Sequence, residues 1–188
     1  MNTPTHLLIA VTAFGKPAEF RINTGAILGG LLPDLSLYAM AGYSLFILGN
    51  SGDHVFGTQY FSEEWQNVFR IDNSLFLWGG LLAAGMMLAR PWLSALGGSG
   101  ILHIVTDLPL HNDDARQHFW PATDWVFESP ISYWDSSRYG NIVSVVEAGL
   151  CLVLMIVLVR RFRSIPGRAL VLLCGAPQIA LVVAFAIR

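Results

Sequence analysis

Long apolar stretches alternate with short polar segments along the chain, and the apolar stretches have lengths typical of membrane helices. A helix needs about 20 mostly apolar residues to cross a bilayer, and fewer where the bilayer thins. Six stretches are predicted to be helices: residues 5–14, 24–49, 73–89, 92–108, 141–160 and 168–187. We expect the second one to break or kink at Pro33, because proline removes a backbone donor and clashes with the preceding turn. The pattern predicts one all-α domain over residues 1–188, a polytopic membrane helix bundle of about five or six helices.

The composition agrees with a membrane protein. Hydrophobic residues make up 54% of the chain and charged residues only 13%, with a mean hydropathy of +0.53. Soluble domains carry about 25% charged residues, so this chain has too little polar surface for a soluble enzyme. The net charge of -2 and the lack of a basic face argue against a nucleic-acid binder. The expected surroundings are membrane lipids, with a second membrane protein as a further candidate partner.

Basic residues predict how the bundle is oriented. Seven Lys and Arg residues lie in the segments 15–22, 90–91 and 160–168, whereas the polar segments 50–72 and 111–140 contain three. Basic residues concentrate on the cytoplasmic side of membrane proteins. We therefore expect 50–72 and 111–140 to be external loops. Whether residues 35–49 cross the membrane or re-enter it stays open at this stage.

Several ionisable residues lie in or beside the apolar stretches. A charged side chain inside a span costs about 3 kcal/mol, so each one suggests a function. Asp34, His103, Asp107 and Glu147 lie within or at the ends of such stretches, and His6 begins the first. His103 and Asp107 are four residues apart, which puts both on one face of a helix. They could offer a nitrogen and an oxygen to one metal ion, or simply hydrogen-bond to each other.

The predicted topology places all of these groups toward the external side of the bundle. Nitrogen and carboxylate ligands from several helices are how metal sites in bundles are built. Zn²⁺ suits a mixture of His and Asp best, and Mn²⁺ or Fe²⁺ are alternatives. Asp34 and Glu147 would also suit a small transporter or proton pathway, although the chain has no visible internal repeat.

Four short motifs carry a resemblance to a known family. They are Thr5-His6, Leu32-Pro33-Asp34, the stretch from Arg70 to Asn73-Ser74-Leu75, and His103-x-x-x-Asp107. As an ordered set over residues 1–120 they resemble a bacterial inner-membrane family of membrane-bound metal-dependent hydrolases, distantly related to zinc-dependent phospholipase C. The segment from His111 to Asp135 is similar to a narrower subgroup, some members of which are associated with cobalamin biosynthesis.

The resemblance implies a metal site and a reaction. His6, Asp34, His103 and Asp107 match the family motifs and inherit the role of ligands to a divalent metal, zinc first. The middle motif departs from the family, because Asn73 stands where a second histidine is expected, and Phe69 or Val68 where the first is. Asn73 would be a weak zinc ligand, and Asp72 could compensate.

The expected function is metal-dependent hydrolysis of a lipid or lipid-linked phosphoester on the periplasmic side of the bacterial inner membrane. We expect Asp72, His111 or Glu147 to complete the metal shell or to act as general base. The alternative is a non-catalytic assembly or interaction protein whose polar residues form a structural network between helices.

Overall fold

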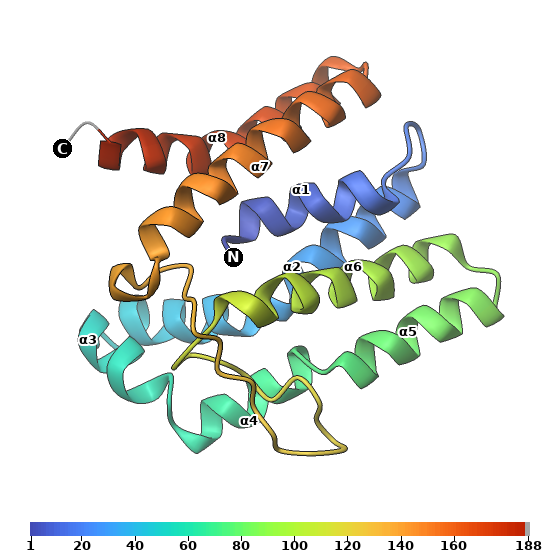
Figure 1. Ribbon diagram of the computed structural model, residues 1–188. Coiled ribbons are helices and arrows are strands. Elements are labelled where there is room, and N and C mark those ends of the chain that lie inside the picture. Colours follow the sequence, from blue (N-terminus) through green and yellow to red (C-terminus); the bar gives the residue numbers. More distant parts are fainter. Residues whose placement is uncertain (187–188) are drawn as a thin grey trace.

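The computed structural model describes the backbone of residues 1–186 and the side chains of residues 1–180 and 182, and within that range all regular secondary structure is helical (Figure 1). The main helices are α1 (Thr3–Phe14), α2 (Phe20–Gly42), α4 (Glu63–Asp72), α5 (Leu75–Met87), α6 (Pro91–Asp107), α7 (Gly140–Arg161) and α8 (Ile165–Ala186). Residue 187, at the end of the last predicted stretch, lies outside the described residues. The prediction of an all-α bundle is confirmed.

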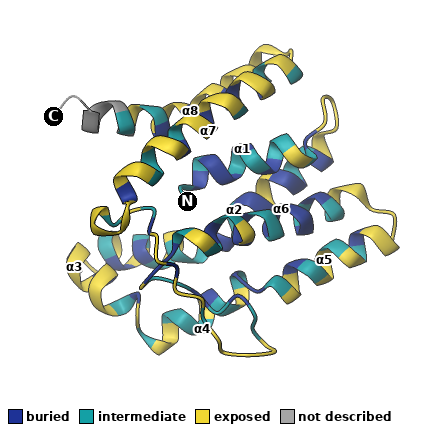
Figure 2. Ribbon diagram, in the orientation of Figure 1, coloured by how far each residue is buried: buried dark blue, intermediate teal, exposed yellow. Residues whose placement is uncertain are grey.

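Three helical segments are long and apolar enough to cross a membrane: Phe20–Ile47, Pro91–Leu110 and Gly140–Arg161. Thr3–Phe14 and Ile165–Ala180 are apolar but shorter. Figure 2 shows continuous exposed faces on α5, α7 and α8, and these faces carry large apolar side chains such as Met87, Val146 and Leu173. Apolar surface of this extent is expected where a helix faces lipid.

The predicted break at Pro33 is wrong, because α2 continues through this residue and runs on into a π-helical turn, η1 (Tyr43–Ile47). Close packing explains why the helix persists. Pro33 deprives the carbonyl of Gly29 of its usual partner, but a side chain at Gly29 would meet the carbonyl oxygen of Leu96 at 2.2 Å. α2 is therefore pressed against α6 at this point. Packing against a neighbouring helix compensates for the lost backbone hydrogen bond.

The helices are arranged around α1, α2 and α6. α2 packs along α6, α5 covers the other side of α6, and the pair α7 and α8 lies against α1 (Figure 1). Small residues permit the close contacts: a side chain at Gly25 would meet the carbonyl oxygen of Trp92 at 2.2 Å, and one at Gly100 would meet the Trp78 ring at 2.1 Å. The first turns of α1 and the last turns of α6 consequently lie side by side in the interior.

The two polar segments differ from each other. Residues 50–72 were expected to form a loop, but they fold into α3 (Gly52–His54), the π-helical η2 (Val55–Gln59) and α4. Ser62 caps α4 by accepting a hydrogen bond from the Trp65 amide, and the inward face of the helix buries Phe69. A helix this polar on one face was missed because only its buried face is apolar. Residues 111–140, in contrast, form the expected loop, apart from the short 3₁₀ turn η4 (Ser136–Arg138).

Candidate metal centre

Three buried side chains from two helices meet where α1 begins and α6 ends. His6 is the fourth residue of α1, and His103 and Asp107 lie in the last turns of α6. One ligand atom from each residue can be chosen so that all three lie within 4.8 Å of one another. The two imidazole rings are stacked, with centroids 3.7 Å apart. The (i, i+4) spacing and the close approach of α1 to α6 together produce this cluster.

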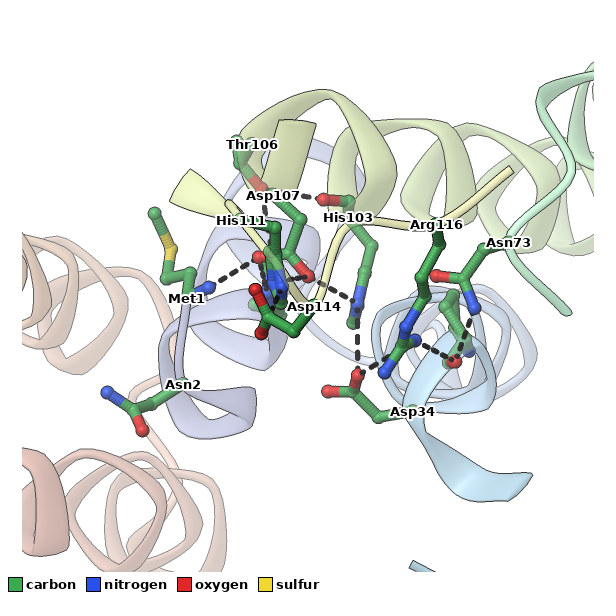
Figure 3. A network of polar contacts seen from close by, with 12 residues as sticks. Met1, Asn2, Asp34, Asn73, His103, Thr106, Asp107, His111, Asp114 and Arg116 are labelled. Atoms are coloured by element: carbon green, nitrogen blue, oxygen red, sulfur yellow. Dashed lines mark hydrogen bonds and ion pairs between the residues drawn. The ribbon is translucent and has the colours of Figure 1, made fainter. Parts of the chain in front are cut away.

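Asp107 is the centre of a larger group of imidazoles (Figure 3). Its Oδ1 lies 2.9 Å from His6 Nε2, and its Oδ2 lies 3.3 Å from both His103 Nε2 and His111 Nε2. The amino nitrogen of Met1 is 2.5 Å from Asp107 Oδ1. Three Nε2 atoms thus face the two oxygens of one carboxylate.

The opposite ring nitrogens of His103 and His111 are held by groups that can only accept hydrogen bonds. His103 Nδ1 lies 2.9 Å from the carbonyl oxygen of Gly30, and His111 Nδ1 lies 2.8 Å from Asp114 Oδ2. Each Nδ1 must therefore carry the hydrogen. In a neutral imidazole this leaves Nε2 as a lone pair, which is the tautomer that binds metals.

His6 is oriented in the same way by a hydroxyl group. Its Nδ1 lies 3.3 Å from Thr106 Oγ1, while the Thr106 hydroxyl donates to the backbone carbonyl oxygens of Leu102, at 2.8 Å, and His103, at 3.0 Å. Because the hydroxyl hydrogen is engaged there, Thr106 accepts a hydrogen bond from His6 Nδ1. His6 Nε2 is then also a lone pair directed at Asp107.

Lone pairs that face carboxylate oxygens need a positive charge between them. His103 Nε2 is buried and has no hydrogen-bond partner of acceptable geometry, although Asp107 Oδ2 lies 3.3 Å away and Asp34 Oδ1 lies 3.5 Å away. Two ligands of one tetrahedral zinc ion are separated by about 3.3 Å, given bonds of about 2 Å. The residues present therefore fit a divalent metal in donor type, tautomer and spacing.

Asp34 enters the cluster from the middle of α2. Its Oδ2 accepts a hydrogen bond of 2.6 Å from Thr3, whose hydroxyl also contacts the Tyr38 hydroxyl. Arg116 Nη1 lies 3.9 Å from Asp34 Oδ1 and donates to the carbonyl oxygen of Pro33 at 3.3 Å. Asp34 thus has one oxygen held by Thr3 and one directed at His103 and Arg116.

The loop after α6 adds a second layer of ionisable groups. Burial favours the neutral form of His111, but hydrogen bonds with Asp107 and Asp114 outweigh it and raise the pKa of His111. Burial likewise opposes the charge on Asp114, yet the hydrogen bonds from His111 and Trp134 lower its pKa. His118 has no such carboxylate, so its burial lowers its pKa to about 4, and its ring donates to the Asn73 carbonyl.

Two predicted site residues lie elsewhere. Glu147 accepts three hydrogen bonds, from the Asn2 amide, the Asn2 side chain and the Thr5 hydroxyl, and thereby ties the start of α1 to α7. Asp72 lines a separate cavity with Ser36 and Trp78, and burial raises its pKa. The structure therefore brings together His6, Asp34, His103, Asp107 and His111, and it leaves Asp72 and Glu147 out.

Asn73, which replaces the family's histidine, also lies outside the cluster. Its side chain is buried and donates to the carbonyl oxygens of Pro33, at 3.1 Å, and Phe69, at 3.0 Å. It therefore joins the end of α4 to α2 and contributes nothing directly to the candidate ligand set. Arg116 donates to the same Pro33 oxygen, so both side chains hold the backbone immediately before Asp34.

Sequence analysis overlooked the residues that orient the imidazoles. Thr106 adjoins Asp107 and Asp114 stands three residues after His111, so their spacing was a signal, but both also fit an ordinary helix end and a solvated acidic loop. Gly30 acts through its backbone carbonyl, which no side-chain pattern reveals.

Comparison of the chain with models of known protein families, with curated proteins and with solved structures yields no match. The resemblance to membrane-bound hydrolases therefore stays a prediction from the short motifs.

Proposed function

We propose that this chain is a membrane-embedded, metal-dependent hydrolase, with zinc as the expected metal. The observation that supports this most strongly is the common orientation of three imidazoles around Asp107. His6, His103 and His111 each have Nδ1 held by an acceptor and Nε2 directed at this carboxylate. Such outer partners fix the tautomer and orientation of metal-binding histidines.

The residues divide into ligands and a base. His6, His103, Asp107 and Asp34 would hold the metal, which when bound lowers the pKa of a water ligand to about 7 and polarises the scissile ester. His111 is the proposed general base, because its Nε2 faces the cluster, 3.3 Å from Asp107 Oδ2. Asp114, at 2.8 Å from Nδ1, would stabilise the resulting imidazolium.

The proposed substrate is a lipid or lipid-linked phosphoester at the external face of the bacterial inner membrane. The turns that join α1 to α2, α5 to α6 and α7 to α8 lie at one end of the bundle and carry Lys16, Arg90 and Arg163 (Figure 1). The candidate metal centre lies toward the other end. The positive-inside rule then favours a centre on the periplasmic side.

Metal content tests the proposal directly. Detergent-purified protein analysed by mass spectrometry should contain about one divalent metal ion per chain, and His103→Ala and Asp34→Ala should each lose most of it. His54→Ala is the matched control, because His54 is exposed and makes no side-chain contact with the cluster. Equal metal content in all four proteins, or none in the wild type, would refute the proposal.

A second candidate function is a non-catalytic assembly protein. The Glu147 carboxylate favours it, because both of its oxygens accept hydrogen bonds from Asn2 or Thr5 and form a polar link between α7 and the start of α1. This reading expects metal-free protein that co-purifies with one membrane partner, with the same yield of partner from wild type and His103→Ala.

A further inference from the structure

A cleft of about 440 Å³ opens beside the candidate metal centre. Its polar wall contains His111, Asp113, Asp114 and Arg116, and the rest is mostly apolar and includes Phe56, Phe61 and Trp134. Binding sites for small molecules commonly have this size and combine an apolar wall with a few polar groups. His111 connects the cleft to the cluster, because its Nε2 lies 3.3 Å from Asp107.

Arg116 supplies a positive charge deep in the cleft. Its side chain is 5% exposed and lies over the ring of Phe69, with the guanidinium carbon 4.9 Å from the ring centroid. One donor, Nη1, is used by the carbonyl oxygen of Pro33, whereas Nε is buried and has no partner. A buried guanidinium donor without a partner is costly, and an anionic oxygen of a ligand would satisfy it.

Exposed aromatic residues make the rim of the cleft apolar, in contrast to the charged Arg116 inside it. Phe56 is 51% exposed, Phe61 49% and Trp134 57%, so these rings present apolar surface outside the cleft. Phe46 and Ile47, on the turn that ends the Phe20–Ile47 span, are also exposed. Aromatic side chains at such positions are typical of the boundary between lipid and water, where a hydrocarbon chain can pass from the bilayer into the protein.

We propose that the cleft is the substrate site and binds an amphiphile with a phosphoryl head, which Arg116 holds, and a hydrocarbon tail, which lies along Phe56 and Phe61. The inference rests on the proposed function, because it places the phosphoester beside the residues that would bind the metal. It adds Arg116 as the residue that recognises the phosphoryl head of the substrate, and Phe56 and Phe61 as the surface that binds its hydrocarbon tail.

The test is equilibrium binding to the full chain in a phosphate-free maltoside detergent, with EDTA present so that nothing is hydrolysed. The probe is dioctanoyl phosphatidic acid, and the signal is tryptophan fluorescence. Arg116→Gln should weaken binding about 10- to 100-fold, since it removes a charged hydrogen bond, and Arg116→Lys should recover part of the loss. Dioctanoylglycerol, which lacks the phosphate, should bind wild type and Arg116→Gln equally.

The tail is tested by Phe56→Ser, which should weaken binding of phosphatidic acid about 10-fold. Phe76→Ser is the matched control, because this phenylalanine is 54% exposed and does not line the cleft, so the variant should bind like wild type. This pair also keeps the test decisive if Arg116→Gln does not fold. Inorganic phosphate should bind at least 10-fold more weakly than the lipid, and equal binding would overturn the claim for a tail.

Metal content measured on the same protein preparations before EDTA is added separates the two proposals. If wild type contains metal but Arg116→Gln and Phe56→Ser bind the lipid as wild type does, the substrate site is wrong and the metal centre stands. If lipid binding depends on Arg116 and Phe56 but no metal is bound, the hydrolase proposal fails while the amphiphile site is supported.

Discussion

Thr106→Val probes the candidate metal centre without touching a ligand. Valine has nearly the same shape as threonine but no hydroxyl, so the substitution removes only the group that accepts a hydrogen bond from His6 Nδ1 at 3.3 Å. His6 then loses the contact that keeps its hydrogen on Nδ1 and its Nε2 lone pair directed at Asp107.

The expected loss follows from the geometry. Removal of such an outer hydrogen bond typically weakens metal binding 10- to 100-fold. The contact of Thr106 with His6 is long, at 3.3 Å, so we expect a loss near 10-fold, or about 1.4 kcal/mol. The contact of Asp114 with His111 is 2.8 Å and involves a carboxylate. Asp114→Asn should therefore reduce hydrolytic activity more strongly than Thr106→Val does.

Zinc affinity measured by competition with a chromophoric chelator is the appropriate assay. Thr24→Val is the matched control, because the Thr24 hydroxyl also donates to a carbonyl four residues earlier, that of Phe20, at 2.9 Å, but contacts no histidine. The reasoning fails if Thr106→Val and Thr24→Val bind zinc equally well. A purely structural role of Thr106 would lower thermal stability in the variant and leave its zinc affinity intact.

Three further predictions concern stability. Glu147→Gln removes a charged acceptor of three hydrogen bonds, so thermal denaturation should show a free energy of unfolding lower by about 1.5–3 kcal/mol. Its metal content should stay that of wild type, and loss of metal would contradict a purely structural role of Glu147. Gly29→Ala should cost about 1–3 kcal/mol, because its side chain would meet the Leu96 carbonyl, whereas Gly42→Ala, with open space around it, should not destabilise. The pKa of His118 is lowered from 6.5 to about 4, so the buried neutral ring contributes up to about 3 kcal/mol above pH 6.5, and this is lost as the pH falls toward 4. In His118→Asn, thermal denaturation should depend less on pH over this window, and an unchanged slope would argue against the assignment.

The sequence alone was sufficient to locate the apolar helices and the ionisable residues that lie among them. Apolar length is a local property, so residues 92–108 and 141–160 were identified close to the observed α6 and α7. The spacing of His103 and Asp107 likewise determines that both share one face of a helix. These inferences need no knowledge of how the helices pack.

Tertiary structure decided which of the ionisable residues meet. Glu147 and His6 were both predicted to belong to the site. In the structure Glu147 accepts hydrogen bonds from Asn2 and Thr5, whereas His6 stacks on His103. Arg116 follows Asp113 and Asp114 closely in the sequence, but the loop folds back and places it beside Asp34. Distances between helices depend on packing across more than 70 residues of sequence, which no local pattern encodes.

The continuity of α2 through Pro33 has the same cause. A local rule counts the lost backbone hydrogen bond and predicts a break, whereas the close contact of Gly29 with α6 holds the helix together. The tautomers of the histidines are also a tertiary property, because the Gly30 carbonyl and the Thr106 hydroxyl reach them only in the folded chain. The sequence thus determines which donor atoms are present, and the packing of α1, α2 and α6 brings them close together.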